Sequence, residues 1–419
     1  MISASWVLPL DGPPLENGFV RWEDGRIVEV GEGRAECHYD NAVILPGFVN
    51  AHSHLEYANY AGFGDGLDFG PWIGIHIERK GRLTREDMLA VARVGAADSL
   101  RSGITTTADY SFSGATAAAA DELGLRATVY LEVFAKEAEE AQRQFAAKRE
   151  RVADSALVTI GVSPHAPYTC TLEVYEWCLS LGIPVGTHLA ESSHEDDWLI
   201  HGEGPIKDAP TAVPSPGKRP AQALAPVLCP ELLCAHCVNL DAADIALLAA
   251  HDVPVAHCPR SNALLGCGIA PLSDLRAAGL RVGLGTDSPA STPSFDMFEE
   301  MRTAVYMARA RDRRAGALSG DDALRLATID AARALRMDAA VGTLTPGKRA
   351  DLTVVSLAGS PYHPVEDPAA AVVFGGSPER VLETIVEGET RYRTGDSEWQ
   401  EVRSTASAAR GRMLAPRQP

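Results

Sequence analysis

The chain is short of positive charge. It carries 38 Lys and Arg residues against 56 Asp and Glu residues, so its formal net charge at pH 7 is −18. A nucleic-acid-binding protein needs basic patches that neutralise phosphates. The acidic balance therefore argues against nucleic acid as a partner, and otherwise mainly indicates solubility.

Long hydrophobic runs are also missing. No apolar stretch approaches the roughly 18 residues of a membrane-spanning helix, so we expect no membrane partner. The N-terminal segment MISASWVLPLDGPP has neither the basic start nor the apolar core of a secretory signal peptide. We therefore expect a cytoplasmic protein.

Cysteine is scarce, with 8 residues in 419 and no spacing typical of a disulfide framework. Cys234 and Cys237 form a C-x-x-C pair, but no second pair follows to complete a structural zinc site. The spacing alone also fits a redox pair. We favour small buried residues in a strand.

The order of apolar segments indicates an α/β fold. Counting from residue 52, eight strand-like segments alternate with Ala-rich helical segments as far as residue 287. Repeated βα units of this length predict a closed parallel barrel. Both ends of the chain are rich in short strands, with a hairpin turn at EDGR, and we expect them to pair into one small β-domain.

Two segments stand apart from this pattern. Residues 204–230 are Pro-rich and are interpreted as a loop excursion over one face of the barrel, and the tail 398–419 carries no recognisable motif.

His52 and His54 stand one residue apart at the end of an apolar run. In a strand, residues i and i+2 share one face, so the two imidazoles point the same way and can hold a metal between them. For an isolated His-x-His, two surface histidines in a loop are an equally good explanation.

Polar residues end the later predicted strands as well. Barrel enzymes carry their chemistry at the C-terminal ends of the strands. A buried, hydrogen-bonded histidine is the commoner explanation for any one of these positions. Together, however, six of the 12 histidines lie at strand ends, and the residues concerned after the first strand are His165, His188 with Glu191, His236, His257 and Asp287.

Three imidazoles and one carboxylate suit Zn²⁺ or Fe²⁺, and in favourable zinc sites the pKa of a metal-bound water falls to about 7. Glu191 can pass a proton from that water to a leaving nitrogen. His236 can orient the hydroxide or stabilise developing charge. Asp287 can ligate the metal, accept a proton, or do both.

Seven motifs in order resemble those of the amidohydrolase superfamily, most closely its adenosine/cytosine-deaminase and triazine-hydrolase branch. They are PGFVNAHSHLE, GITTTAD, THLAES, AHCVNL, HCPRSNALL, GLGTDS and GTLTPGKRADLTVV, and the resemblance covers about residues 1–395. It implies a distorted (β/α)8 TIM barrel beside a small β-sandwich. We expect the catalytic barrel over residues 47–340 and a discontinuous β-sandwich domain from residues 1–46 and 341–397.

The resemblance also implies roles for individual residues. Glu191 matches the proton-shuttling glutamate, His236 the catalytic histidine, and His165 a position that contacts substrate, while His257 supports the site from behind. The implied metal ligands are His52, His54, His188 and Asp287. Members with two metals bridge them through a modified lysine, which SPHAPY lacks, so we expect one divalent metal, Zn²⁺ with Fe²⁺ as the alternative.

The implied activity is hydrolytic deamination, a reaction on the C–N bond of a cyclic amidine. Resemblance to bacterial deaminases favours a 6-aminopurine nucleoside such as aminodeoxyfutalosine, S-adenosylhomocysteine or methylthioadenosine, with aminodeoxyfutalosine the narrowest expectation. Alternatives are a guanine, pterin, cytosine or triazine aminohydrolase, or a chlorohydrolase. A non-catalytic scaffold relative is a remote alternative, because such a protein is expected to lose ligands that are all present here.

Trp72 lies in the segment 62–84, which we expect to cap the barrel mouth. Its ring can either pack against the substrate or anchor the loop to the barrel. A homodimer is expected only because it is usual among relatives.

Overall fold

The structure is a computed structural model that describes residues 1–362, 364–396 and 398–415. Residue 397, at the predicted domain boundary, and residues 416–419 of the predicted tail lie outside the described residues. Among those described, no helix combines the length and the apolar character needed to cross a membrane.

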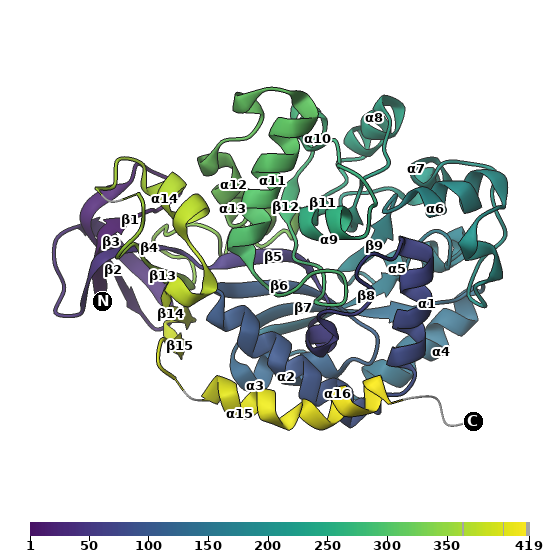
Figure 1. Cartoon of the computed structure of the whole chain (residues 1–419), viewed down its shortest axis with the longest axis horizontal. Helices are drawn as coiled ribbons and strands as arrows, with labels where there is room; N and C mark the ends of the chain where they lie inside the picture. The colour runs from purple at the N-terminus through teal and green to yellow at the C-terminus, as the bar shows by residue number, and fades with distance from the viewer. Residues whose placement is uncertain (363, 397, 416–419) are drawn as a thin grey trace.

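Eight parallel strands form one sheet in which each strand pairs with its neighbour in the chain (Figure 1). The two edge strands meet where Ser53 bridges Asp287 in parallel, and the Asp287 N–H donates to the His52 carbonyl across 3.0 Å. The prediction of a parallel barrel is thus confirmed, and the barrel is nearly closed. Its strands are β5 (Phe48–Ser53), β6 (Ile104–Ser111), β7 (Arg126–Val133), β8 (Val158–Pro164), β9 (Val185–Leu189), β10 (Leu232–His236), β11 (Val255–His257) and β12 (Val282–Leu284).

Helices cover the outside of the barrel. The longest, α2 (Arg85–Arg101), begins at a capping box in which Thr84 and Asp87 bond each other's backbone N–H groups, and its apolar side is buried. The others that follow barrel strands are α3 (Ala115–Leu123), α4 (Ala138–Arg149), α5 (Leu172–Ser180), α6 (Ser193–Asp196), α8 (Ala242–Ala250), α9 (Pro259–Leu264), α10 (Leu272–Ala277), α11 (Met297–Asp312), α12 (Gly320–Leu326) and α13 (Ile329–Ala334).

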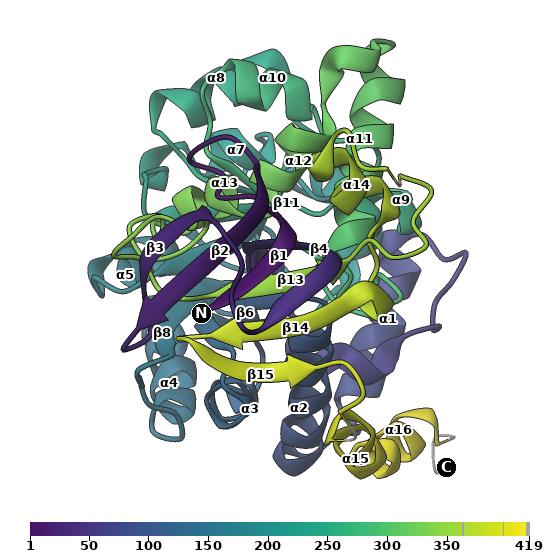
Figure 2. The same ribbon diagram turned by 90° about the vertical axis from the view of Figure 1, so that its left-hand side faces the viewer.

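The predicted β-domain from both ends of the chain is present as one connected seven-stranded sheet (Figure 2). The EDGR turn joins its second and third strands, with Asp24 and Gly25 both at positive φ. The two halves meet where β4 pairs antiparallel with β13. In spatial order the strands are β15 (Glu389–Arg393), β14 (Val381–Val386), β13 (Leu352–Ser356), β4 (His38–Pro46), β1 (Ile2–Val7), β2 (Leu15–Glu23) and β3 (Arg26–Glu32), and the helix α14 (Pro368–Gly375) lies between β13 and β14.

The segment after the first barrel strand covers the mouth of the barrel with η1 (Leu55–Tyr60) and α1 (Phe69–Lys80). The Pro-rich excursion also reaches this mouth, because Pro205 and Ile206 line the same cavity as α1. The excursion is largely irregular, as predicted, with the short helical turns η3 (Pro205–Asp208), α7 (Pro220–Ala223) and η4 (Ala225–Val227).

The tail forms two helices that the sequence did not reveal, α15 (Glu398–Thr405) and α16 (Ser407–Leu414). They run beside α2 toward α1 (Figure 1). Arg412 pairs with Asp87, and Met413 is buried in the cluster that holds Trp72.

All eight cysteines are free thiols. Cys234 is buried within β10 and Cys237 just after its end, as expected for small packing residues.

Candidate metal centre and catalytic pocket

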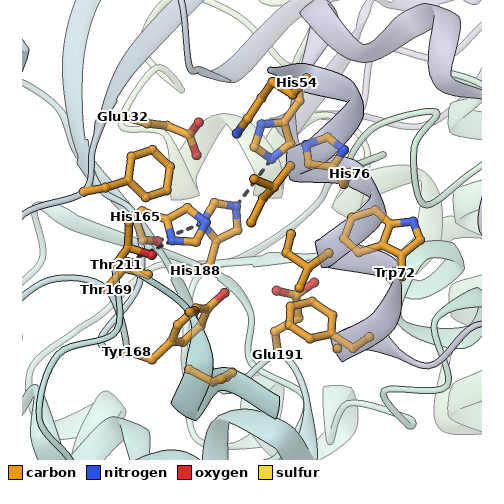
Figure 3. A pocket seen from close by; sticks show the side chains of 18 of the residues that line it. His54, Trp72, His76, Glu132, His165, Tyr168, Thr169, His188, Glu191 and Thr211 are labelled. Atoms are coloured by element: carbon orange, nitrogen blue, oxygen red, sulfur yellow. Dashed lines mark hydrogen bonds between the residues drawn. The ribbon is translucent and has the colours of Figure 1, made fainter. Parts of the chain in front are cut away.

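The predicted site residues converge at the C-terminal ends of the barrel strands. One cavity is lined there by His54, His165, His188, His236, Glu191, Asp287 and Trp72 (Figure 3). His52 lies fully buried against this group, with its ring 4.9 Å from that of His54 and 5.0 Å from that of His188, measured between centroids.

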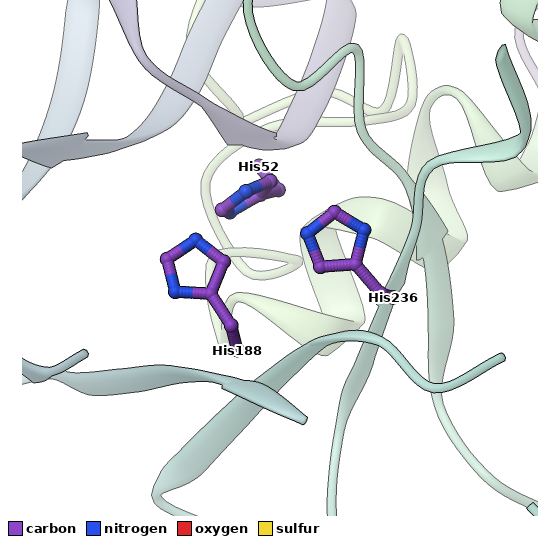
Figure 4. Close-up of side chains that lie close together, drawn as sticks. All are labelled: His52, His188 and His236. Carbon is purple, nitrogen blue, oxygen red and sulfur yellow. The ribbon is translucent and has the colours of Figure 1, made fainter. Parts of the chain in front are cut away.

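The potential ligand atoms lie close enough to share a cation. Those of His52, His54 and Asp287 are all within 4.8 Å of one another, and so are those of His52, His188 and His236. Figure 4 shows the last three rings facing a common space. The closure of the barrel helps to form this cluster. The backbone hydrogen bond between Asp287 and His52 brings together two predicted ligands from the first and last strands of the barrel.

Hydrogen bonds decide which nitrogen each histidine offers. Nδ1 of His54 bonds the Tyr110 carbonyl at 2.7 Å, and Nδ1 of His188 bonds the His165 carbonyl at 2.8 Å. A carbonyl oxygen can only accept, so each Nδ1 carries the proton and each Nε2 keeps a free lone pair. This is the arrangement found behind metal-ligating histidines.

The surroundings of the His52 ring show whether a metal would fit this site. Neither of its ring nitrogens has a hydrogen-bond partner among the described residues, although both are buried. Burial and the neighbouring charges of His54 and His188 hold its pKa well below the usual value, so the ring is neutral. A neutral imidazole has one lone pair, and a cation in the shared space would take up that lone pair of His52.

Asp287 presents one oxygen to the same space. Its Oδ2 accepts from the hydroxyls of Ser261 at 2.6 Å and Ser291 at 2.9 Å. Its Oδ1 lies 3.8 Å from Nε2 of His52 and 3.7 Å from Nε2 of His54. Burial opposes ionisation, but the charges of His236 and His54 and the two hydroxyls outweigh it and leave the pKa of Asp287 lowered. The site therefore offers a divalent metal three imidazoles and a carboxylate.

Glu191 and His236 form a second pair beside the predicted metal ligands. The carboxylate of Glu191 lies 3.7 Å from Nε2 of His236, whose Nδ1 pairs with the Asn262 side-chain oxygen at 3.1 Å. Burial, and then the charge of Asp287, raise the pKa of Glu191 well above its usual value. The raised pKa favours the protonated form, as suits a group that takes up a proton and delivers it within the pocket.

The remaining predicted residues take different positions. His165 lines the cavity, with Nδ1 bonded to the Thr169 hydroxyl at 2.9 Å. Trp72 lines the cavity, and its indole N–H donates to the Ala290 carbonyl at 2.9 Å, which anchors its segment. Its packing against the substrate stays a prediction. His257 is buried and does not line the cavity. Burial and the adjacent His236 lower the pKa of His257 to about 3.

Sequence reasoning missed several cavity residues, among them His76, Lys80, Glu132, Phe134, Tyr168 and Ser288. Glu132 had a usable signal, because it is the one acidic residue of β7 and lies near the C-terminal end of that strand. The residues on α1 had none, since their helix faces the barrel mouth only through tertiary packing.

The chain matches the amidohydrolase family over residues 43–391. The 5-methylthioadenosine/S-adenosylhomocysteine deaminase of Moorella thermoacetica is 33% identical over 417 residues, which cover 94% of this chain and 94% of that protein.

Solved structures are similar along almost the whole chain. An adenosine deaminase from Xanthomonas campestris with bound zinc has a TM-score of 0.86 and 27% identity, and the match covers 98% of both chains. An atrazine chlorohydrolase from Arthrobacter aurescens complexed with zinc has a TM-score of 0.85 and 21% identity over 98% of this chain and all of that one, a likeness of fold alone. These matches confirm the resemblance seen in the motifs: the chain belongs to the amidohydrolase family and is a hydrolase that acts on C–N bonds of cyclic amidines.

Proposed function

We propose that the protein is a metal-dependent deaminase that releases ammonia from a 6-aminopurine nucleoside. The observation that carries the proposal is Glu191, a buried carboxyl with a raised pKa that faces His236 beside the His and Asp ligand set. An amine must be protonated before it leaves, and Glu191 is placed to supply that proton.

The metal ligands in this proposal are His52, His54, His188 and Asp287. Bound there, a divalent metal supplies Lewis-acid activation of water. We propose Zn²⁺, because the ligand set suits it and the Xanthomonas relative contains bound zinc. Fe²⁺ remains the alternative, and metal analysis of the purified protein distinguishes the two.

The protein's own groups carry out the proton transfers. Glu191 donates its proton toward the ring nitrogen next to the amine-bearing carbon, and it receives a proton from the attacking water in exchange. His236 stabilises the charge that develops during this addition. A second transfer through Glu191 protonates the amine, the C–N bond breaks, and the products are ammonia and the 6-oxopurine.

The nucleoside part of the proposal rests on the relatives, which are named as deaminases of methylthioadenosine, S-adenosylhomocysteine or adenosine. Aminodeoxyfutalosine remains our narrowest candidate. A homodimer and a cytoplasmic location also remain proposals, and light scattering on the purified protein tests the first.

The decisive experiment measures ammonia release from aminodeoxyfutalosine, S-adenosylhomocysteine, methylthioadenosine, adenosine, guanine, cytosine and a melamine-type triazine. We expect release from the adenosine-type compounds, and their relative kcat/KM names the substrate. Ammonia release only from a free base or a triazine would show that the proposed substrate class is wrong, while the proposed mechanism would stand. If protein with one bound metal releases no ammonia from any compound of the panel, the proposed deamination is wrong.

A further inference from the structure

A second buried carboxylate faces the pocket and has no part in the proposed proton transfers. Glu132 lies near the C-terminal end of β7, is only 2% exposed and lines the cavity. Figure 3 shows Glu132 and Glu191 on different sides of His188. The carboxylate oxygens of Glu132 take no hydrogen bond from any side chain or backbone group in the part of the chain that the structure describes.

Neighbouring cations make this charge tolerable. The negative charge of Glu132 raises the pKa of Lys80 and of Lys148, in opposition to burial, which dominates and lowers both. The ammonium of Lys80 lies 4.0 Å from the centre of the Phe112 ring and 5.6 Å from that of Phe134. The lysines therefore balance the charge of Glu132 without occupying its acceptor positions.

Glu56, the other carboxylate near Lys80 and Lys148, has the hydrogen bonds expected of a structural residue. It accepts from the hydroxyls of Ser111 and Ser113 and from the backbone N–H of Phe112. Glu56 is thus fully used within the fold. Glu132 keeps its acceptor capacity for a group that enters the pocket, and that group must donate hydrogen bonds.

A metal is a poor candidate for that group. Ligand atoms of Glu132, His165 and His188 do lie within 4.8 Å of one another. However, Nδ1 of His188 is committed to a carbonyl, Nδ1 of His165 to Thr169, and Nε2 of His188 lies 3.4 Å from Nε2 of His54 on the other side. A cation beside Glu132 would compete with those contacts.

We propose that Glu132 binds the ribose hydroxyl groups of the substrate and selects nucleosides over free bases. This inference rests on the proposed function and extends it. A carboxylate has two acceptor oxygens, and vicinal hydroxyls offer two donors to them, as acidic residues do for the ribose of bound dinucleotides. Glu132 is then a specificity residue on the side of the pocket away from Glu191.

The test compares adenosine with 2′,3′-dideoxyadenosine, which differ only in the two hydroxyls. We expect the wild-type kcat/KM to be roughly 30-fold or more higher for adenosine, because charged hydrogen bonds are among the strong ones. Glu132→Gln should reduce this ratio to roughly 5-fold, and Glu132→Ala should bring it close to one. Glu122→Gln changes an exposed carboxyl on α3 outside the pocket and should keep the wild-type ratio.

Metal content provides the second readout. We expect Glu132→Gln to retain one metal per chain, and its loss, or a second metal in the wild type, would make Glu132 a ligand and overturn the inference. An unchanged ratio in both Glu132 variants would also overturn it while nucleoside deamination stands. If no nucleoside releases ammonia, the proposed function is wrong and this inference fails with it.

Discussion

His188 directs both its backbone N–H and its ring Nδ1 to one acceptor, the carbonyl oxygen of His165, at 2.9 Å and 2.8 Å. The first bond ties the strand of His188 to its neighbour in the barrel, and the second fixes the tautomer and direction of the imidazole. The fold and the metal site therefore depend on the same carbonyl. Distortion of this strand end would change metal affinity as well as stability.

Glu191→Gln should abolish most turnover and spare the metal. Glutamine preserves the shape of the side chain but cannot shuttle a proton, so we expect kcat to fall by roughly 10²–10⁴-fold. Ammonia release gives the rate, and elemental analysis gives the metal content. Glu203→Gln, a change of an exposed residue just before the excursion, serves as the control. A near-wild-type rate of ammonia release by Glu191→Gln would show that Glu191 is not the proton shuttle.

Asp287 and its supporting hydroxyls should affect metal binding to different degrees. Asp287→Asn removes the one anionic ligand, so we expect protein that purifies with little metal. Ser291→Ala removes one of two hydrogen bonds that orient the carboxylate, and we expect roughly 10-fold weaker metal binding. Competition with a chelator measures both affinities. Equal metal affinity in wild type and Asp287→Asn would remove Asp287 from the ligand set.

The tail helix α16 should position the wall of the pocket. Met413 is 1% exposed and lies in the apolar cluster of Phe69 and Trp72, and the side chain of Arg82, just beyond α1, donates to its carbonyl. Met413→Ala leaves a cavity behind α1, so we expect a KM several-fold higher and a kcat little changed.

Leu414→Ala provides the matched control, because Leu414 is half exposed on the same helix. Steady-state kinetics on the best nucleoside separates the two parameters. A fall in kcat at unchanged KM would show that α16 acts on the chemistry and not on the pocket wall.

The barrel and most of the candidate site were predictable from the sequence for local reasons. Parallel barrel strands are buried on both sides, so several of them appear as short apolar runs, and a polar residue at or just after the end stands out, as His188 and Asp287 do. Tertiary detail was not predictable. The lone pair that His54 offers depends on a carbonyl of a neighbouring strand, at Tyr110.

The tail helices and the cavity-lining residues on α1 were not predicted either, because they too depend on tertiary packing. Both tail helices are only eight residues long, and what holds α16 is tertiary, through Met413 and the pair of Arg412 with Asp87. Trp72 was ambiguous from sequence because an aromatic side chain can line a cavity with its ring and anchor its segment through its N–H. The anchor is observed, and packing against the substrate stays a prediction.

Glu195 should give the protein a pH-dependent stability that a glutamine lacks. It is 1% exposed and accepts from the backbone N–H of Glu191 at 2.9 Å, and burial is the main reason that its pKa is raised from 4.5 to about 8. Between these two pH values the folded protein holds one proton more than the unfolded chain. The free energy of unfolding therefore falls as pH rises through this window, by at most about 1.4 kcal/mol per pH unit from this group.

Glu195→Gln cannot titrate, so it removes this slope and adds only a constant cost from its buried amide. Urea unfolding of both proteins between pH 5 and pH 9 should show the variant gaining stability relative to the wild type as pH rises, with the difference levelling above pH 8. Titrating groups that do not interact with Glu195 cancel in the comparison. Parallel curves across the whole range would mean that Glu195 is ionised in the folded protein, despite its burial.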